Sequence, residues 1–115
     1  NGSIVIHSDG SQTRDYVFVD DVVNAMVTSA TASGVDQQII NIGSGLETSV
    51  RELARLVVQA TGTKPEEIYN PHKYGGADRM CADITKAYEK LNYLPLIPLE
   101  VGLRLTLERD PQFQK

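Results

Sequence analysis

The stretch GSQTRDYVFVDDV, residues 10–22, carries the strongest fold signal in this chain. Its centre, Asp15–Val19, is aromatic and β-branched, a composition that is typical of a buried strand. Asp20 or Asp21 then supplies a carboxylate for the N-cap of a helix, where negative charge also suits the helix dipole. The apolar residues of that helix fall on one face, namely Val22, Val23, Met26, Val27 and Ala30. The stretch therefore predicts a strand that leads directly into a helix.

Outward from this stretch, short apolar runs alternate with helical patterns. Residues 4–7 and 38–42 are short apolar runs that predict two further strands. Ser49 and Glu52 have the spacing of a capping box, which predicts the start of a second helix. Gly62 is a plausible residue to end that helix, because glycine adopts the left-handed conformation at low cost.

The C-terminal half continues the alternation less regularly. Residues 67–69 fit a short strand, and residues 79–82 fit extended chain. Asp83 can cap a third helix, and a fourth is expected over residues 99–109, before a proline that disfavours helix in the residue preceding it. We therefore expect an α/β fold with a few short strands and about four helices.

The composition bounds the function. The 115 residues are enough for about one domain, so we treat residues 1–115 as a single unit. The net charge of −4 argues against a broad surface for nucleic acid, which needs basic side chains. No apolar run approaches the length of a membrane span, and no signal peptide is visible. The chain begins at Asn1 and enters an apolar run directly, so we expect a piece of a longer protein.

Metal and thiol chemistry are not expected. The only histidines, His7 and His72, are not at ligand spacing from each other or from Cys81, whereas a structural zinc site needs four convergent ligands. Cys81 lies between Met80 and Ala82 in an apparent extended segment. We therefore interpret it as a small buried hydrophobic residue and not as a nucleophile.

Two motifs of dehydrogenase chemistry are present only in part. Gly43 and Gly45 supply two glycines of a dinucleotide fingerprint that needs three, so we interpret GSG 43–45 as a strand-to-helix turn. The alternative is that its backbone N–H groups point at an anion. Tyr69 and Lys73 have the spacing of a catalytic tyrosine–lysine pair, but Pro71 between them would break the helix that such a pair requires.

Two arginines are the main candidates for binding. Arg14 stands at the mouth of the predicted strand, and Arg79 follows a glycine-rich loop. Together they would suit a diphosphate, because arginine binds phosphate in bidentate fashion and stays charged. The alternative is that each arginine is an ordinary surface residue or pairs with a nearby carboxylate, such as those of Asp15, Asp78 and Asp83.

The same residues resemble those of a known family. The segments that match it in order and spacing are residues 10–22, NIGSG 41–45, SVREL 49–53, Arg79, ADITKA 82–87 and LEVGL 99–103. The chain resembles the extended short-chain dehydrogenases, the NAD-dependent nucleotide-sugar epimerases and dehydratases, and among them the UDP-glucose 4-epimerase type. The likeness is to their carboxy-terminal, substrate-binding part.

The resemblance implies that two domains of the parent enzyme have different roles. An upstream Rossmann domain, absent from these residues, would bind NAD and carry the catalytic tyrosine and lysine. This chain would bind the diphosphate of a UDP-sugar or another nucleotide sugar through Arg14 and Arg79, with Gln12 and Tyr16 as weaker candidates for nucleotide contact. It would contain no catalytic, cofactor-binding or metal-binding residue, and it would be inactive alone. Cytoplasmic localisation would follow from the usual place of NAD chemistry.

Several alternatives remain open from the sequence. The parent enzyme would be an isomerase of the epimerase type. The alternative is a dehydratase or decarboxylase of the same family. A second class is a non-catalytic module that binds nucleotide sugars, and a third is an interaction protein. We also expect exposed apolar surface at residues 4–7 and 15–19, where the upstream domain would dock, with homo-oligomerisation as another way to cover it.

Overall fold

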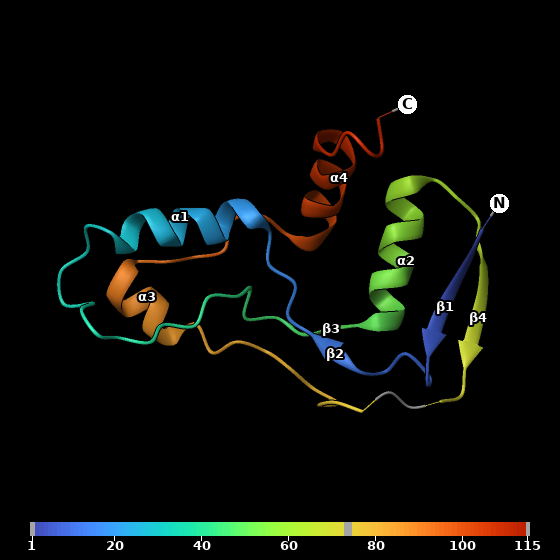
Figure 1. Ribbon diagram of the computed structural model, residues 1–115, viewed down its shortest axis with the longest axis horizontal. Helices are drawn as coiled ribbons and strands as arrows, with labels where there is room; N and C mark the ends of the chain where they lie inside the picture. The colour runs from blue at the N-terminus through green and yellow to red at the C-terminus, as the bar shows by residue number, and fades with distance from the viewer. Residues whose placement is uncertain (1, 73–74, 115) are drawn as a thin grey trace.

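The computed structural model describes residues 2–72 and 75–114. Within them the chain forms four helices and four short strands (Figure 1), which confirms the expected α/β class and helix number. The strands are β1 (Ser3–His7), β2 (Thr13–Arg14), β3 (Thr48–Ser49) and β4 (Glu66–Asn70). The helices are α1 (Val19–Ser29), α2 (Val50–Thr61), α3 (Thr85–Leu91) and α4 (Leu99–Arg109).

The strands form two small sheets. β1 and β4 are parallel, with Val5 opposite Ile68, so the strands predicted over residues 4–7 and 67–69 are confirmed. A parallel pair needs a long crossover connection, and α2 lies in that connection and contacts β1. β2 and β3 are antiparallel, with Arg14 opposite Thr48. An isolated bridge joins Thr13 to Arg79 and extends this second sheet by one segment.

Two predicted strands are wrong. The segments 15–18 and 38–42 have no ladder partner in the part of the chain that the structure describes. β-branched and aromatic composition indicates a segment suited to a pleated, half-buried surface, but a strand also requires a neighbour with which to pair. Ile40 and Ile42 instead pack as irregular chain against the core, and α1 begins at Val19, inside the segment predicted to be a strand.

The caps follow the sequence only in part. Ser49 Oγ accepts a hydrogen bond from the Glu52 backbone N–H at 3.1 Å, and Gly62 ends α2 with φ of +64°, both as predicted. Asp83 lies one residue before the N-cap position of α3, and its carboxylate accepts from the Thr85 backbone N–H at 3.0 Å. Asp83 therefore stabilises the start of α3 as expected, although it does not occupy the N-cap position itself.

The expected cap of α1 is wrong. Phe18 occupies the N-cap position, and both candidate carboxylates lie in the first turn. Asp21 is buried, with 2% of its surface exposed, and accepts from the backbone N–H groups of Leu96 and Ile97, each at 3.1 Å. Asp20 accepts from Arg109 Nη1 at 2.8 Å. Because chain segments distant in sequence supply these donors, the carboxylates hold α1 to α4 and the segment before it.

The core is small and the molecule is thin. Ala25, Ala87, Leu91 and Tyr93 form a buried cluster between α1 and α3, while α2 and α4 pack together at the other end (Figure 1). The molecule measures 51 × 35 × 17 Å, with a radius of gyration of 16.8 Å. A compact domain of this length would have a radius near 13 Å. Its accessible surface of 8324 Å² likewise exceeds the roughly 6,200 Å² expected for this mass.

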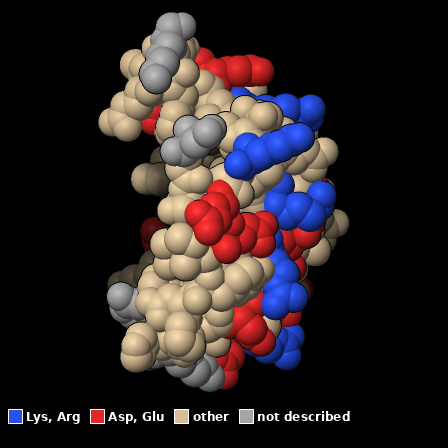
Figure 2. Space-filling view, turned by 90° about the vertical axis from the view of Figure 1, so that its right-hand side faces the viewer, with Lys and Arg blue, Asp and Glu red and all other residues tan. Residues whose placement is uncertain are grey.

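This thinness leaves apolar side chains in solvent. Val5 of β1 and Val19 at the start of α1 are 51% and 59% exposed, so apolar surface is exposed where the sequence predicted it. The exposed face of α1 continues through Val23, Met26 and Val27. Acidic and basic side chains are interspersed on the face shown in Figure 2, without a broad area of either charge. Among the described helices, none is both long and apolar enough to span a bilayer.

Candidate functional site

An open pocket of about 510 Å³ lies beside β2. Three separate segments form its wall, and they supply Arg14, Asp15, Val17, Asn41, Ile42, Gly43, Arg79, Met80, Cys81, Ala82 and Asp83. The pocket thus contains both arginines that the sequence singled out. Its volume lies in the range of small-molecule sites.

A backbone bridge brings the two arginines together. The Thr13 N–H donates to the Asp78 carbonyl at 2.9 Å, and the Met80 N–H donates to the Thr13 carbonyl at 3.2 Å. Residues 78–80 therefore run alongside β2, which places Arg79 next to the strand that carries Arg14. Both arginines are predicted from the sequence, but the bridge between their segments depends on chain pairing that local sequence does not determine.

Backbone carbonyls orient Arg14. Its Nη1 donates to the Thr13 carbonyl at 2.7 Å and to the Ala77 carbonyl at 2.9 Å. These acceptors are neutral, so the two bonds fix the guanidinium without neutralising its charge. An oriented cation of this kind is suited to an anionic group in the pocket.

A carboxylate that the sequence analysis missed holds Arg79. Arg79 Nε donates to Glu47 Oε1 at 2.9 Å, and Nη2 donates to Glu47 Oε2 at 2.6 Å. These hydrogen bonds, with one from the Thr13 hydroxyl at 2.6 Å, lower the pKa of Glu47 to about 2. The partner is therefore none of the carboxylates considered from sequence. The signal that identifies Glu47 is the β2–β3 register, which follows from the fold and not from local sequence.

Asp15 assembles the wall of the pocket. Its carboxylate accepts from Ser44 N–H at 2.7 Å, Ser44 Oγ at 2.6 Å, Gly45 N–H at 2.9 Å and Ala82 N–H at 3.1 Å. Burial raises the pKa of Asp15, but the hydrogen bonds from Ser44, Ala82 and Gly45 outweigh burial and lower it overall. The GSG turn does direct N–H groups at an anion, and that anion is an internal carboxylate.

Gly43 is required by this close packing. A Cβ at position 43 would lie 2.5 Å from the Ala82 Cβ and 2.6 Å from Asp15 Oδ2, closer than real Cβ atoms approach other atoms. The Gly43 carbonyl accepts from the Tyr93 hydroxyl at 2.7 Å, which links the pocket wall to the core. Packing thus explains this glycine without a dinucleotide.

The predicted burial of Cys81 is wrong. Cys81 is an exposed free thiol at the pocket edge, because residues 79–82 line the pocket and do not enter the core. Partial desolvation raises the pKa of the thiol, and the Asp15 and Glu47 carboxylates raise it further. Cys81 is therefore protonated near neutral pH and is a weak nucleophile.

The other sequence candidates lie outside this pocket. The Gln12 carbonyl accepts from Val50 N–H at 3.0 Å, and neither Gln12 nor Tyr16 is among the lining residues. Tyr69 belongs to β4, whereas Lys73, its partner in the rejected catalytic pair, lies outside the described residues. In residues 2–72 and 75–114, no three His, Cys, Asp or Glu side chains converge as metal ligands would.

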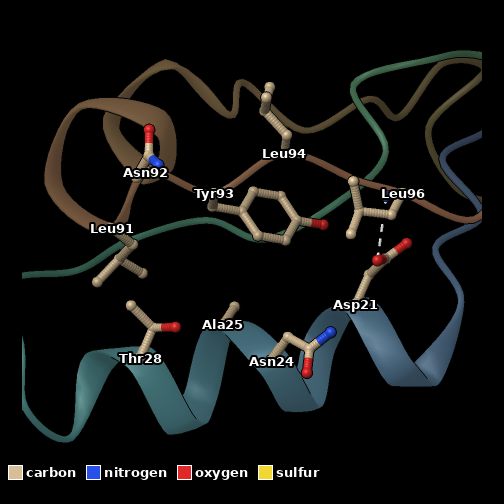
Figure 3. A pocket seen from close by; sticks show the side chains of 9 residues that line it. All are labelled: Asp21, Asn24, Ala25, Thr28, Leu91, Asn92, Tyr93, Leu94 and Leu96. Carbon is tan, nitrogen blue, oxygen red and sulfur yellow. Dashed lines mark hydrogen bonds between the residues drawn. The ribbon is translucent and has the colours of Figure 1, made fainter.

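A second pocket lies between α1 and the segment that follows α3 (Figure 3). Its volume is about 160 Å³, and Asp21, Asn24 and Tyr93 are among its lining residues. The Asp21 carboxylate is already engaged by backbone N–H groups there, including that of Leu96. This pocket is smaller than the roughly 300 Å³ at which small-molecule sites begin, so the pocket beside β2 is the better candidate.

Comparison with known proteins places these features in context. Residues 1–43 match the model of the NAD dependent epimerase/dehydratase family. The chain is 43% identical over 103 residues to the UDP-glucose 4-epimerase of Mycolicibacterium smegmatis, covering 90% of this chain and 33% of that protein. It is 32% identical to the UDP-N-acetyl-alpha-D-glucosaminuronate decarboxylase of Bacillus cytotoxicus, covering 91% of this chain and 34% of that protein.

A solved structure agrees over nearly the whole chain. The UDP-glucose 4-epimerase of Thermotoga maritima, crystallised with UDP-glucose, superposes with a TM-score of 0.88 at 38% identity. The match covers 98% of this chain and 36% of that protein. The chain therefore spans about a third of the length of the relatives that it matches.

Proposed function

We propose that this chain binds the nucleotide diphosphate of a sugar nucleotide as part of an NAD-dependent epimerase, and its similarity to the NAD-dependent epimerase/dehydratase family supports the proposal. The observation that carries the proposal is the pocket beside β2, which both Arg14 and Arg79 line. Two guanidiniums suit a diphosphate in both charge and geometry. Both are held in place before a ligand arrives, Arg14 by carbonyls and Arg79 by Glu47.

The chain would contribute to the reaction by binding the substrate and orienting its sugar. NAD held by an upstream domain would supply reversible hydride transfer at the sugar. Only two glycines of a dinucleotide fingerprint are present, and the N–H groups of Ser44 and Gly45 are taken by Asp15, so these residues do not fit the cofactor. Binding of the diphosphate, remote from the reacting carbon, restricts the position of the sugar and can raise the rate of reaction there. The 115 residues alone are expected to be inactive.

A decarboxylase or dehydratase is the second candidate, and the similarity to the Bacillus cytotoxicus enzyme favours it. The diphosphate pocket would serve either reaction, because the reacting carbon lies elsewhere in the substrate. An assay of the full-length gene product with UDP-sugars separates the two. A product of unchanged mass with inverted C4 supports epimerisation, whereas loss of carbon dioxide or water excludes it.

The binding proposal is tested by ligand protection of the full-length gene product. UDP-glucose should raise the unfolding temperature of the wild type, because binding to the native state alone stabilises it. Arg14→Met and Arg79→Met should each reduce this shift, and the double variant should abolish it while still folding. Arg55→Met is the matched control, because Arg55 also pairs with a glutamate but lies outside the pocket. Equal protection of the wild type and the double variant would contradict the assignment.

A non-catalytic binding module is the remaining alternative. It predicts protection by UDP-glucose together with no turnover of any UDP-, TDP- or GDP-sugar by the full-length gene product. Turnover that is lost in the double arginine variant would contradict it and support the enzyme.

A further inference from the structure

Glu47 links the strand that carries Arg14 to the segment that carries Arg79. Its Oε1 accepts from the Thr13 hydroxyl at 2.6 Å and from Arg79 Nε at 2.9 Å, and its Oε2 accepts from Arg79 Nη2 at 2.6 Å. Thr13, Glu47 and Arg79 thus form a connected set across the β2–β3 pair and the bridge to residue 79. We call this set the Thr13–Glu47–Arg79 link.

The geometry of the link leaves part of Arg79 available. A guanidinium carries five N–H donors, and Glu47 engages the side edge formed by Nε and Nη2. The end edge, formed by Nη1 and the second hydrogen of Nη2, is not used by Glu47. It can therefore donate two hydrogen bonds to phosphate oxygens while the carboxylate keeps its own pair.

Because Glu47 is itself held in place, we infer that it positions Arg79 for a ligand and does not compete with the ligand for Arg79. Arg79 is 78% exposed in its side chain, whereas Glu47 is 26% exposed and is held by a second donor, Thr13. An exposed arginine with no partner loses rotamer freedom when it binds a ligand. With Glu47 in place, much of that freedom is already lost before the ligand arrives.

We propose that Glu47 is a positioning residue for the nucleotide diphosphate, acting through Arg79. The inference rests on the proposed function, since it concerns how that same pocket recognises its ligand. The proposal predicts that Glu47 increases the affinity for the diphosphate. Its negative charge alone would decrease that affinity, because a carboxylate repels a nearby diphosphate.

The test is a double-mutant cycle on the full-length gene product. Calorimetry would measure UDP-glucose affinity for the wild type, Glu47→Gln, Arg79→Met and the double variant. We expect Glu47→Gln to weaken binding about two- to fivefold, the range of an exposed ion pair, and to have no further effect once Arg79 is methionine. In turnover, KM should rise by the same factor with kcat unchanged, as for an interaction made equally in the ground and transition states.

Glu52→Gln is the matched control. Glu52 holds Arg55 through the same two-bond geometry, at 2.8 and 2.6 Å, on the surface of α2, and neither residue lines the pocket. Its replacement removes the same charge and should leave UDP-glucose affinity unchanged.

The outcomes separate the two proposals. Unchanged or tighter binding by Glu47→Gln, or an equal loss in the Arg79→Met background, would overturn the positioning role while leaving the pocket assignment intact. Failure of the wild type to bind UDP-glucose, or unchanged binding by Arg79→Met, would overturn the proposed function and the positioning role with it.

Discussion

At the scale of single residues, the pocket depends on two carboxylates that hold its wall together and that our proposal does not assign to ligand binding. Asp15 holds the GSG turn and Ala82 together, and Glu47 holds Arg79. Hydrogen bonds to an ionised acceptor are stronger than those between neutral groups. Each carboxylate thus fixes one part of the wall of the pocket that both arginines line.

The Asp15 network predicts a pH-dependent stability. The pKa of Asp15 is lower in the folded chain than its ordinary value near 3.8, so the unfolded chain binds the proton more tightly. Its contribution is therefore fully present above that ordinary value and is lost as the pH falls through the lower, folded pKa. Asp15→Asn should lower the free energy of unfolding by about 1–3 kcal/mol at neutral pH, because the asparagine NH₂ group would face backbone N–H groups that need an acceptor.

Urea unfolding of both proteins across this pH range measures the effect. The gap in unfolding free energy between wild type and Asp15→Asn should narrow as the pH falls through the titration of Asp15. Asp36→Asn, at an exposed position, is the control and should change little at any pH. A gap that is constant with pH would contradict the role of the Asp15 charge.

The arginines show what sequence can reveal at this scale. Arg14 and Arg79 were found from their positions beside a polar turn and a glycine-rich loop, and the structure places both at one pocket. Glu47 and the role of Asp15 were missed, because their partners are far away in sequence and depend on strand register and loop packing. The role of the arginines in diphosphate binding stays a prediction.

At the scale of elements, helices were easier to predict than strands. The start of α2 follows from Ser49 and Glu52, and the bounds of α4 match the expectation, because caps and periodicity are local. The segments 15–19 and 38–42 were assigned to strands on composition alone. Composition says nothing of whether a neighbouring strand is present, and these segments have none in the described chain.

The cap of α2 gives a prediction at this scale. Ser49→Ala should lower the free energy of unfolding by about 1 kcal/mol, because the Glu52 N–H loses its acceptor. Ser29→Ala is the matched control, since Ser29 lies at the end of α1 and its hydroxyl donates to the Met26 carbonyl instead. Chemical denaturation compares the two variants, and equal losses would argue against the cap.

At the scale of the whole molecule, the thin shape is the main feature. A plate 17 Å thick has room for little more than one layer of packed elements, so only a few side chains are fully buried. The exposed face of α1 follows from this shape, since the side chains of Val19, Val23, Met26 and Val27 are between 48% and 67% exposed.

This face predicts how the 115-residue chain behaves in solution. Met26 and Val27 are 65% and 67% exposed, so replacing both with glutamine should change the unfolding free energy by less than about 0.5 kcal/mol. The same change should reduce binding of an apolar fluorescent dye. Ile39→Gln, at a position outside α1 that is 84% exposed, is the control and should leave dye binding nearly unchanged. A large loss of stability in the double variant would mean that another molecule covers the face.

The bridge between Thr13 and Arg79 has a consequence for the order of events during folding. The helix caps form among neighbouring residues, but the bridge joins positions on either side of α1, β3, α2 and β4. Contacts between distant positions form slowly, because a long stretch of chain must be ordered before they are made. A newly made chain would therefore acquire helices early and bring its two arginines together late.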